Sequence, residues 1–318
     1  MMETLLVAVT ITYKIIMKYI VVGGAGFIGS NLVDLLINEG NEVLVIDNLS
    51  TGKKENINTK ADLLVLDISH SVNFNAMIDA MSGADGVFHL AALARVQPSI
   101  ENPHDFNKAN VTGTLNVLHC AKEAGVKRLV YSASSSAYGN ASIFPTPESH
   151  PTDPLSPYGL QKLIGEQYAR VFYHCYGLET VSLRYFNVFG ERQSLEGAYK
   201  LVMGIFAEQK LKNKPMTITG DGEQRRDFTY VGDVARANFL AMTSANVGSG
   251  DVINIGNGDN RSINEIADLF GGDRENIEER LEPKQTLADN SKAKELLGWS
   301  PTTQVEDWIP QYKKSLGI

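Results

Sequence analysis

The chain has 318 residues, of which 43% are hydrophobic and 21% charged, and its formal net charge is −8. This composition is ordinary for a globular protein, and the length allows one large domain or two. An acidic chain without a basic stripe is not expected to bind nucleic acid or an anionic membrane surface, although a local basic pocket for an anionic ligand stays open.

The first sixteen residues, MMETLLVAVTITYKII, do not have the features of a targeting segment. Their apolar run is short and is interrupted by Lys14, the leading charge is Glu3, and a small-residue cleavage site is missing. Met17 then begins MKYIVVGG, which is typical of a first strand. We therefore expect residues 1–16 to be a non-native extension in front of the folded chain, and we expect no membrane segment.

From residue 17 to residue 185, short apolar runs alternate with segments of helical periodicity. Unbroken runs predict strands that are buried on both faces, and their alternation with helices predicts a parallel, doubly wound α/β sheet of the Rossmann type. We assign 17–185 to such a dinucleotide-binding domain. The expected strands lie at 18–24, 41–47, 61–67, 85–91, 127–133 and 179–185.

After residue 185, glycine-rich and charged connections join shorter elements. One more strand is expected within 251–258, a helix from Ser262, and two short helices near the C-terminus. We expect residues 186–318 to form a smaller substrate-binding region, with some segments returning to the sheet. It should cover the carboxyl ends of the strands, where ligands bind in such folds.

The segment GGAGFIG connects the first expected strand to the first expected helix. Gly23, Gly26 and Gly29 allow a tight turn and a close approach of a pyrophosphate to the positive end of the helix, and Phe27 and Ile28 lie in the same turn. A purely structural turn is the alternative for an isolated glycine triplet.

Acidic residues at the ends of the next two strands favour a cofactor. Asp47 ends the second strand, eighteen residues after Gly29, where a carboxylate accepts hydrogen bonds from ribose hydroxyls and would repel the additional phosphate of NADP. Asp67 ends the third strand and suits the adenine side, although a turn role stays open for it. With the adjacent Asn48 and Ile68, these residues predict an NAD site.

Tyr158 and Lys162 lie four residues apart in a helix expected at 157–176, so they share one helix face. A tyrosine removes a proton from a substrate hydroxyl only if its pKa, about 10 in free tyrosine, is lowered. A lysine ammonium one turn away, together with the positive nicotinamide, would lower this pKa. We predict that Tyr158 is the base and that Lys162 also positions the nicotinamide ribose.

These motifs together resemble the extended short-chain dehydrogenase/reductase family. Within that family the chain is most similar to the UDP-hexose 4-epimerases, particularly those that act on UDP-N-acetylhexosamines. The likeness implies NAD as cofactor, a UDP-sugar as substrate, and a homodimer through a four-helix bundle built from helices near 103–124 and 157–176. The matching segments beyond GGAGFIG are HLAAL at 89–93, YSASSSAYG at 131–139, LRYFNVFG at 183–190, RRDF at 225–228 and LADNSKAKELLGW at 287–299.

The resemblance also implies roles for residues of the sheet domain. Ser134, 24 residues before Tyr158, matches the third catalytic position, and Ala91 and Ala92 lie beside the cofactor. Asn110 matches a position near the nicotinamide, with hydrogen bonding only inside the fold as the alternative. His89 is expected to be a core or cofactor-lining side chain. The six histidines and two cysteines have no metal-ligand spacing, so we expect no metal.

Ser135 and Ser136 can contact the substrate or serve only as loop hydroxyls. They also help to distinguish between the reactions that related enzymes catalyse. Related 4,6-dehydratases carry an Asp-Glu pair directly after the catalytic hydroxyl, and decarboxylating relatives carry a glutamate where Ser136 stands. With neither carboxylate here, the simplest outcome is hydride return to the opposite face of the sugar, which is C4 epimerisation. A 4,6-dehydratase, a uronate epimerase, a net dehydrogenase and a non-catalytic dinucleotide sensor stay open as alternatives.

By resemblance, the substrate is held by residues of the second region. Asn187 and Arg226 match diphosphate contacts, with a turn role and a surface ion pair as their alternatives. The expected Arg-x-Gly-Asp loop is altered, so Arg280 is the best second arginine and Lys284 its substitute. Thr286 occupies a position where a bulky tyrosine would exclude 2-acetamido sugars, so it predicts that these sugars are accepted.

Two further predictions complete this interpretation. Arg95 lies near the expected sugar, and the sequence leaves a helix-surface role and a substrate contact equally open. Cys120 and Cys175 fall in expected helices without a CxxC motif, which predicts reduced thiols in a cytoplasmic protein.

Overall fold

A computed structural model describes residues 15–195, 200–279 and 282–318. Arg280 and most of the expected N-terminal extension (residues 1–14) therefore lie outside the described residues. Within the described ranges, no helix combines the length and the apolar character needed to cross a membrane. The same ranges contain no group of three or more His, Cys, Asp or Glu side chains that could hold a metal ion.

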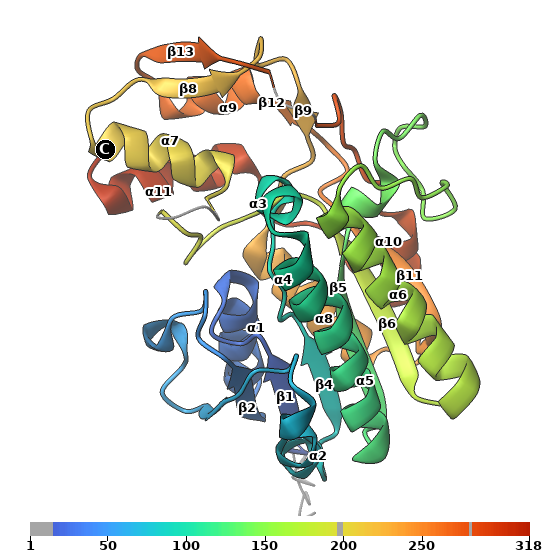
Figure 1. Cartoon of the computed structure of the whole chain (residues 1–318). Helices are drawn as coiled ribbons and strands as arrows, with labels where there is room; N and C mark the ends of the chain where they lie inside the picture. The colour runs from blue at the N-terminus through green and yellow to red at the C-terminus, as the bar shows by residue number, and fades with distance from the viewer. Residues whose placement is uncertain (1–14, 196–199, 280–281) are drawn as a thin grey trace, which may run out of the picture.

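A seven-stranded sheet forms the centre of the larger layer of the molecule (Figure 1). Its strand order is β11-β6-β5-β4-β1-β2-β3 and all neighbours pair in parallel, which confirms the predicted doubly wound fold. The order reverses between β1 and β4, the place where such folds bind ligands. The strands are β1 (Lys18–Val22), β2 (Glu42–Asp47), β3 (Asp62–Val65), β4 (Gly86–His89), β5 (Arg128–Ser134), β6 (Glu179–Tyr185) and β11 (Ser249–Ile255).

Helices cover both faces of the sheet, which explains the unbroken apolar runs. In β1, Tyr19 and Val21 enter one core, whereas Ile20 and Val22 enter the other, because successive side chains of a strand point to opposite faces. The first core is closed by α1 (Phe27–Asn38), α8 (Val231–Thr243) and α10 (Ser291–Leu297), and the second by α2 (Phe74–Met81), α5 (Gly113–Glu123) and α6 (Pro157–Tyr176).

The helix expected around 103–124 is not continuous. After α3 (Val96–Glu101), the chain forms α4 (Pro103–Asn107), then a π-helical segment (Lys108–Thr112), and only then α5. The Thr114 hydroxyl, at the start of α5, donates to the Asn110 carbonyl of this segment (2.6 Å). The wider turn places the buried Asn110 side chain against the loop that follows β4, and such segments are frequent at functional sites.

The smaller region has its own core, in which Phe206, Phe270 and Trp308 are buried. Three helices enclose it: α7 (Val202–Leu211), α9 (Ile263–Phe270) and α11 (Val305–Leu316). Short strands complete it: β8 (Met216–Thr219) pairs with β13 (Arg274–Ile277), β7 (Val188–Phe189) with β10 (Thr229–Tyr230), and β9 (Arg225–Arg226) with β12 (Arg261–Ser262).

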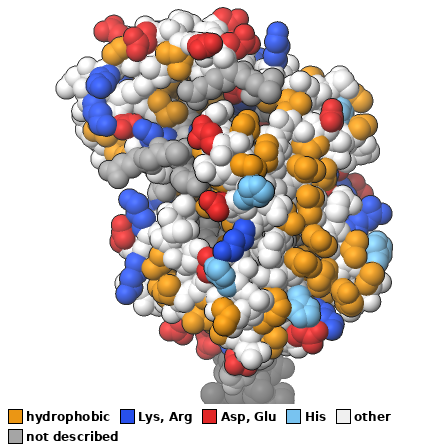
Figure 2. Space-filling model, viewed as in Figure 1, with side chains coloured by type: hydrophobic (Ala, Val, Ile, Leu, Met, Phe, Trp, Pro, Cys, Tyr) orange, Lys and Arg blue, Asp and Glu red, His pale blue; other side chains and the backbone are white. Residues whose placement is uncertain are grey.

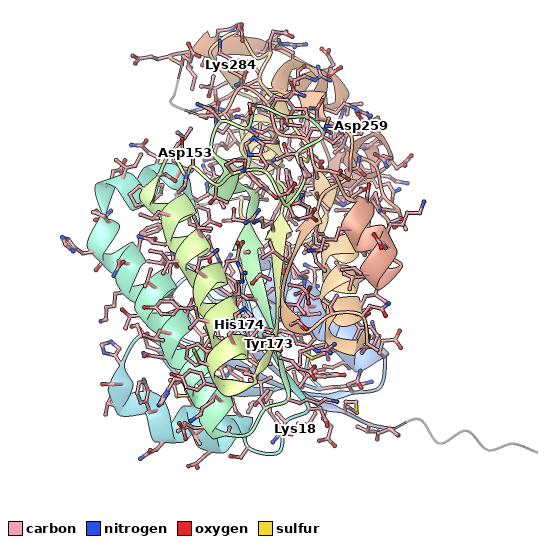
Figure 3. All side chains as sticks on the ribbon, turned by 90° about the vertical axis from the view of Figure 1, so that its right-hand side faces the viewer. Lys18, Asp153, Tyr173, His174, Asp259 and Lys284 are labelled. Carbon is pink, nitrogen blue, oxygen red and sulfur yellow. The ribbon has the colours of Figure 1, made fainter. Side chains whose placement is uncertain are left out.

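The smaller region faces the carboxyl ends of the parallel strands. Lys18, where β1 begins, lies at the end of the molecule opposite to Asp259 and Lys284 (Figure 3). Although they follow residue 186, α8, β11 and α10 belong to the sheet layer. The second half of the chain is thus shared between the two layers, and the junction between them is where the site is found.

Candidate active site

A cavity of about 380 Å³ lies beside the carboxyl ends of β1, β2 and β4, at the point where the strand order reverses. Eight of the predicted cofactor residues line it: Gly23, Gly26, Asp47, Asn48, Asp67, Ile68, Ala91 and Ala92. Phe27, Ile28, Gly29, Asn110, Tyr158 and Lys162, which were also predicted to bind the cofactor, are not among its lining residues.

The three glycines of GGAGFIG have different structural roles. Gly23 has a φ of +87°, and a Cβ there would lie 2.4 Å from the Ala91 nitrogen. A Cβ on Gly29 would lie 2.1 Å from the Gly23 carbonyl oxygen, so this glycine lets α1 pack directly against the turn. On Gly26 a Cβ would meet only that oxygen, at 3.3 Å, on the side that lines the cavity. Gly26 is therefore the glycine that leaves room for a ligand.

The acidic residues at the rim of this cavity are held by short hydrogen bonds. Asp47 accepts hydrogen bonds from the backbone N–H groups of Ala25 (3.0 Å) and Leu49 (2.8 Å). Burial raises the pKa of Asp67, but hydrogen bonds from Ser69 and Asn48 lower it, and the net shift is downward. Two carboxylates around a cleft closed by a glycine turn fit the ribose hydroxyls of NAD.

The structure brings together the three predicted catalytic residues at the end of β5 and the start of α6. Ser134, the last residue of β5, lies close enough to the Tyr158 hydroxyl to lower its pKa. Lys162 is buried one turn further along α6, and its ammonium donates to the Ser132 carbonyl (2.7 Å). Burial lowers the pKa of Lys162 to about 7.

The pKa of Tyr158 is shifted in the direction opposite to our expectation. Burial raises it, whereas the hydrogen bond with Ser134 and the positive charge of Arg95 lower it, and the net shift is upward. Lys162 does not contribute as we expected, because its ammonium is turned toward Ser132 and its own charge is disfavoured by burial. The charge near Tyr158 thus comes from Arg95, a residue for which the sequence left two roles open.

The start of α6 is fixed by hydroxyl groups. Ser156 caps the helix by accepting from the Gly159 N–H (3.1 Å), and Pro157 occupies the first turn as predicted. The Ser99 hydroxyl of α3 accepts from the N–H of Tyr158 itself (3.1 Å). Sequence reasoning did not single out Ser99, because the two partners are separated by 59 positions in the sequence and give no local signal.

Asn110 and the Nε2 atom of His89 make their hydrogen bonds inside the fold. The Asn110 amide oxygen accepts from the Leu93 N–H (2.8 Å), and its nitrogen donates to the Leu93 carbonyl (2.9 Å) and to Gln161 (3.0 Å). The His89 ring lies 2.9 Å from the Thr114 hydroxyl, and burial together with the charge of Lys162 lowers its pKa to about 3. Asn110 thereby fixes the loop that follows β4.

The two serines after Ser134 occupy a short 3₁₀ turn, Ser135–Tyr138, directly after β5. The Ser134 side chain accepts from the Ser136 N–H (3.1 Å), which ties this turn to the Ser134 hydroxyl. Both serines are half-buried. Neither introduces a carboxylate into this turn.

A second cavity, of about 220 Å³, lies between Arg95 and the core of the smaller region. Asn187 and Arg226, which were predicted to contact the diphosphate, are among its lining residues. Arg226 forms an ion pair with Glu282 (2.8 Å), which the sequence did not reveal because the two are far apart in the chain. This glutamate makes the cavity less positive than the arginine alone would suggest.

Thr286 lies behind this cavity and is not among its lining residues. Its hydroxyl contacts the Asn187 amide nitrogen (3.2 Å) and the Asp227 N–H (3.2 Å). Lys284 accepts a backbone hydrogen bond from Arg225 through its carbonyl. Backbone hydrogen bonds of Arg225 with Lys284 and with Thr286 therefore attach the altered loop to β9 on both sides of Gln285.

Comparison with known proteins agrees with this geometry. Residues 19–256 match the NAD dependent epimerase/dehydratase family. A putative UDP-glucose 4-epimerase of Methanocaldococcus jannaschii is 39% identical over 302 residues, which cover 91% of this chain and 95% of that protein.

Two solved structures are similar over 94% of the chain. One is UDP-glucose 4-epimerase of Thermotoga maritima with UDP-glucose (TM-score 0.88, 38% identity, 100% of that chain). The other is UDP-N-acetylglucosamine 4-epimerase of Methanobrevibacter ruminantium with UDP-N-acetylmuramic acid (TM-score 0.86, 35% identity, 99% of that chain).

Proposed function

Since this chain belongs to the NAD dependent epimerase/dehydratase family, of the extended short-chain dehydrogenase/reductase type, we propose that it inverts C4 of a UDP-hexose through a transient 4-keto sugar. The observation that supports the proposal is the meeting of Ser134, Tyr158 and the buried Lys162 at the end of β5 and the start of α6, next to a turn that lacks the carboxylates of the dehydratases.

Some residues of the chain bind the cofactor, and others transfer the proton of the substrate. Asp47, Asn48 and Asp67 hold the adenosine side of NAD, which when bound accepts the hydride from C4 and returns it. Tyr158 takes the proton of the C4 hydroxyl and later gives it back, while Ser134 donates a hydrogen bond to the C4 oxygen. Tyr158 and Ser134 are anchored at the ends of buried elements, so these two side chains need little rearrangement during the reaction.

The nucleotide part of the substrate is bound by the smaller region. Arg226 holds the diphosphate with its guanidinium, and Asn187 supports it from the neighbouring strand connection. Thr286 does not enter the second cavity, because its hydroxyl is turned to Asn187 and Asp227, and we propose on this basis that both plain and 2-acetamido hexoses are accepted. The likeness to the Methanobrevibacter enzyme supports the second class.

A homodimer and a cytoplasmic location complete the proposal. α6 exposes Leu160 and Val171, each 48% accessible, and hydrophobic side chains gather on the right-hand half of the face in Figure 2, where Figure 1 places α6. A second copy of the chain would cover this strip through α5 and α6, giving a four-helix bundle. Cys120 and Cys175 are both free, which suits a reducing compartment.

The test is incubation of the purified protein with UDP-glucose, UDP-N-acetylglucosamine or UDP-glucuronate, followed by proton NMR, with and without added NAD. We expect the matching galacto epimer to appear from at least one of the first two sugars, and no product from a Tyr158→Phe variant. Release of NADH, or a 4-keto-6-deoxy sugar, would favour the dehydrogenase or the dehydratase and refute the proposal.

A further inference from the structure

The segment 48–57, which we call the cofactor loop, follows β2 and forms one wall of the cavity to which we assign NAD. The far end of this loop rests on the glycine turn, because the Lys53 N–H (3.0 Å) and the Asn56 side chain (3.1 Å) both donate to the Ala25 carbonyl. The residues of the loop that line the cavity are Asn48, Ser50 and Thr51. Any opening of the loop would therefore uncover this side of the cavity.

Arg192, from the second half of the chain, holds the end of the cofactor loop against α1. Its Nη1 donates to the Asn56 carbonyl (3.2 Å). Its Nη2 donates to Asn31 Oδ1 (2.9 Å) and to Asp34 Oδ2 (2.6 Å), both on α1. The φ of Arg192 is +67°, in the left-handed region that residues with a Cβ seldom adopt. Such a conformation persists where the surrounding structure fixes it, and these positions cluster at functional sites.

The residue before Arg192 attaches the same stretch to the smaller region. Glu191 Oε1 accepts from Trp308 Nε1 (2.7 Å), and its Oε2 accepts from the Tyr230 hydroxyl (2.8 Å). The Glu191 carbonyl accepts from the Asn31 side chain of α1 (3.0 Å). Residues on both sides of this pair line the second cavity, namely Val188, Phe189 and Gln193. Glu191 and Arg192 thus connect the wall of the second cavity directly to α1 and the cofactor loop.

The exposure and the contacts of the Arg192–Asp34 ion pair argue against a purely stabilising role. The two side chains are 27% and 34% accessible, and ion pairs that are exposed to this extent contribute little to stability. Asp34 also accepts from the Asn58 side chain (2.7 Å), directly after the cofactor loop. The contacts of this pair therefore fix the position of the loop and do not close a core.

We propose that Arg192 is a positioning residue that keeps the cofactor loop closed over bound NAD and links the release of NAD to the occupancy of the second cavity. A loop that is held at its far end opens less often, so a cofactor behind it leaves more slowly. A nucleotide in the second cavity favours the closed arrangement of residues 188–193, and with it the contacts of Glu191 and Arg192. Because such coupling is reciprocal, the nucleotide tightens the binding of NAD, and NAD tightens the binding of the nucleotide by the same factor.

The first test measures the rate constant of NAD release from the loaded protein, with labelled NAD chased by an excess of unlabelled NAD. We expect release to be at least about tenfold faster in Arg192→Gln, because the hydrogen bonds of a charged guanidinium are lost, and intermediate in Arg192→Lys, which keeps the charge. Arg274→Gln removes an ion pair with Asp268 elsewhere in the smaller region, and this control should release NAD like the wild type. Unchanged release in Arg192→Gln would overturn the proposal.

Hydrogen exchange separates a local opening of the cofactor loop from a general loss of stability. In Arg192→Gln, amide exchange should accelerate in residues 48–57 and keep the wild-type rate in β5 and α6. An equal acceleration throughout the sheet layer would mean that Arg192 only stabilises the fold, and would refute its role at the loop.

The link to the second cavity is tested with UDP, which carries no sugar and cannot react. UDP at a saturating concentration should slow NAD release from the wild type by at least about fivefold and have a smaller effect in Arg192→Gln. An effect of equal size in both proteins, or no effect in the wild type, would refute the link.

The link to a nucleotide in the second cavity rests on the proposed function, whereas the effect of Arg192 on NAD release does not. Faster release from Arg192→Gln in a protein that epimerises no UDP-hexose would support the role of Arg192 and refute the proposed function alone. An active epimerase with unchanged release in Arg192→Gln would refute the role of Arg192 alone.

Discussion

Substitutions at Gly29 and Gly26 should separate folding from cofactor binding. In Gly29→Ala, the new methyl group would lie 2.1 Å from the Gly23 carbonyl oxygen and 2.9 Å from the Gly24 Cα, and neither backbone atom can move aside cheaply. Overpacking of this kind destabilises by about 1–3 kcal/mol, which exceeds the gain of about 1 kcal/mol that alanine brings to a helix interior. We expect a net loss of stability in the protein without NAD.

Gly26→Ala is the matched control. Gly26 has a φ of −78° and a ψ of 178°, which alanine adopts freely, and its Cβ makes one contact at 3.3 Å. The smaller entropy of the unfolded chain stabilises by about 0.4–1 kcal/mol and offsets this contact. The methyl group narrows the cavity, so NAD affinity should fall at least about tenfold, or about 1.4 kcal/mol.

Urea unfolding of the NAD-free variants and calorimetric titration with NAD would measure both effects. A Gly29→Ala variant as stable as the wild type, or a Gly26→Ala variant with unchanged NAD affinity, would refute the roles assigned to these two glycines.

Three more perturbations follow from the geometry. Glu166→Gln leaves the buried Arg184 guanidinium uncompensated and should lower the free energy of unfolding by about 3–5 kcal/mol. The double replacement of Glu166 and Arg184 by methionine should lose less, and urea denaturation of the wild type and both variants checks this. The pKa of Lys162 is about 7 in the folded protein, whereas its ordinary value is 10.5. Above pH 7 the unfolded chain therefore binds more protons than the folded one, and the free energy of unfolding rises with pH by at most about 1.4 kcal/mol per pH unit. In Lys162→Met, unfolding experiments above pH 7 should not show this rise. Leu160→Glu combined with Val171→Glu should give a monomer in light scattering, and a wild type that is itself monomeric would contradict the proposed dimer.

Local patterns in the sequence predicted much of the fold. From Tyr19 to Val22, β1 is apolar because both of its faces are buried, and this pattern is visible in the sequence alone. The start of α6 could likewise be placed at Pro157 from a proline and the helical spacing that follows. These signals lie within a few residues of one another, so no long-range information is needed to interpret them.

Features that depend on distant contacts could not be predicted in this way. The π-helical segment is associated with the contact of Asn110 with Leu93, which no periodicity marks. The pKa direction of Tyr158 follows from burial, which arises only when the layers assemble. The Arg226–Glu282 pair likewise joins segments that meet only in the folded chain.

The most direct test of the central claim follows the hydrogen at C4. The NAD-loaded protein is incubated in ordinary water with an accepted UDP-hexose carrying deuterium at C4, and the epimer is analysed by NMR and mass spectrometry. If a transient 4-keto sugar regains the same hydride inside the site, the product keeps its deuterium at C4. Loss of the deuterium to solvent during inversion would contradict the account.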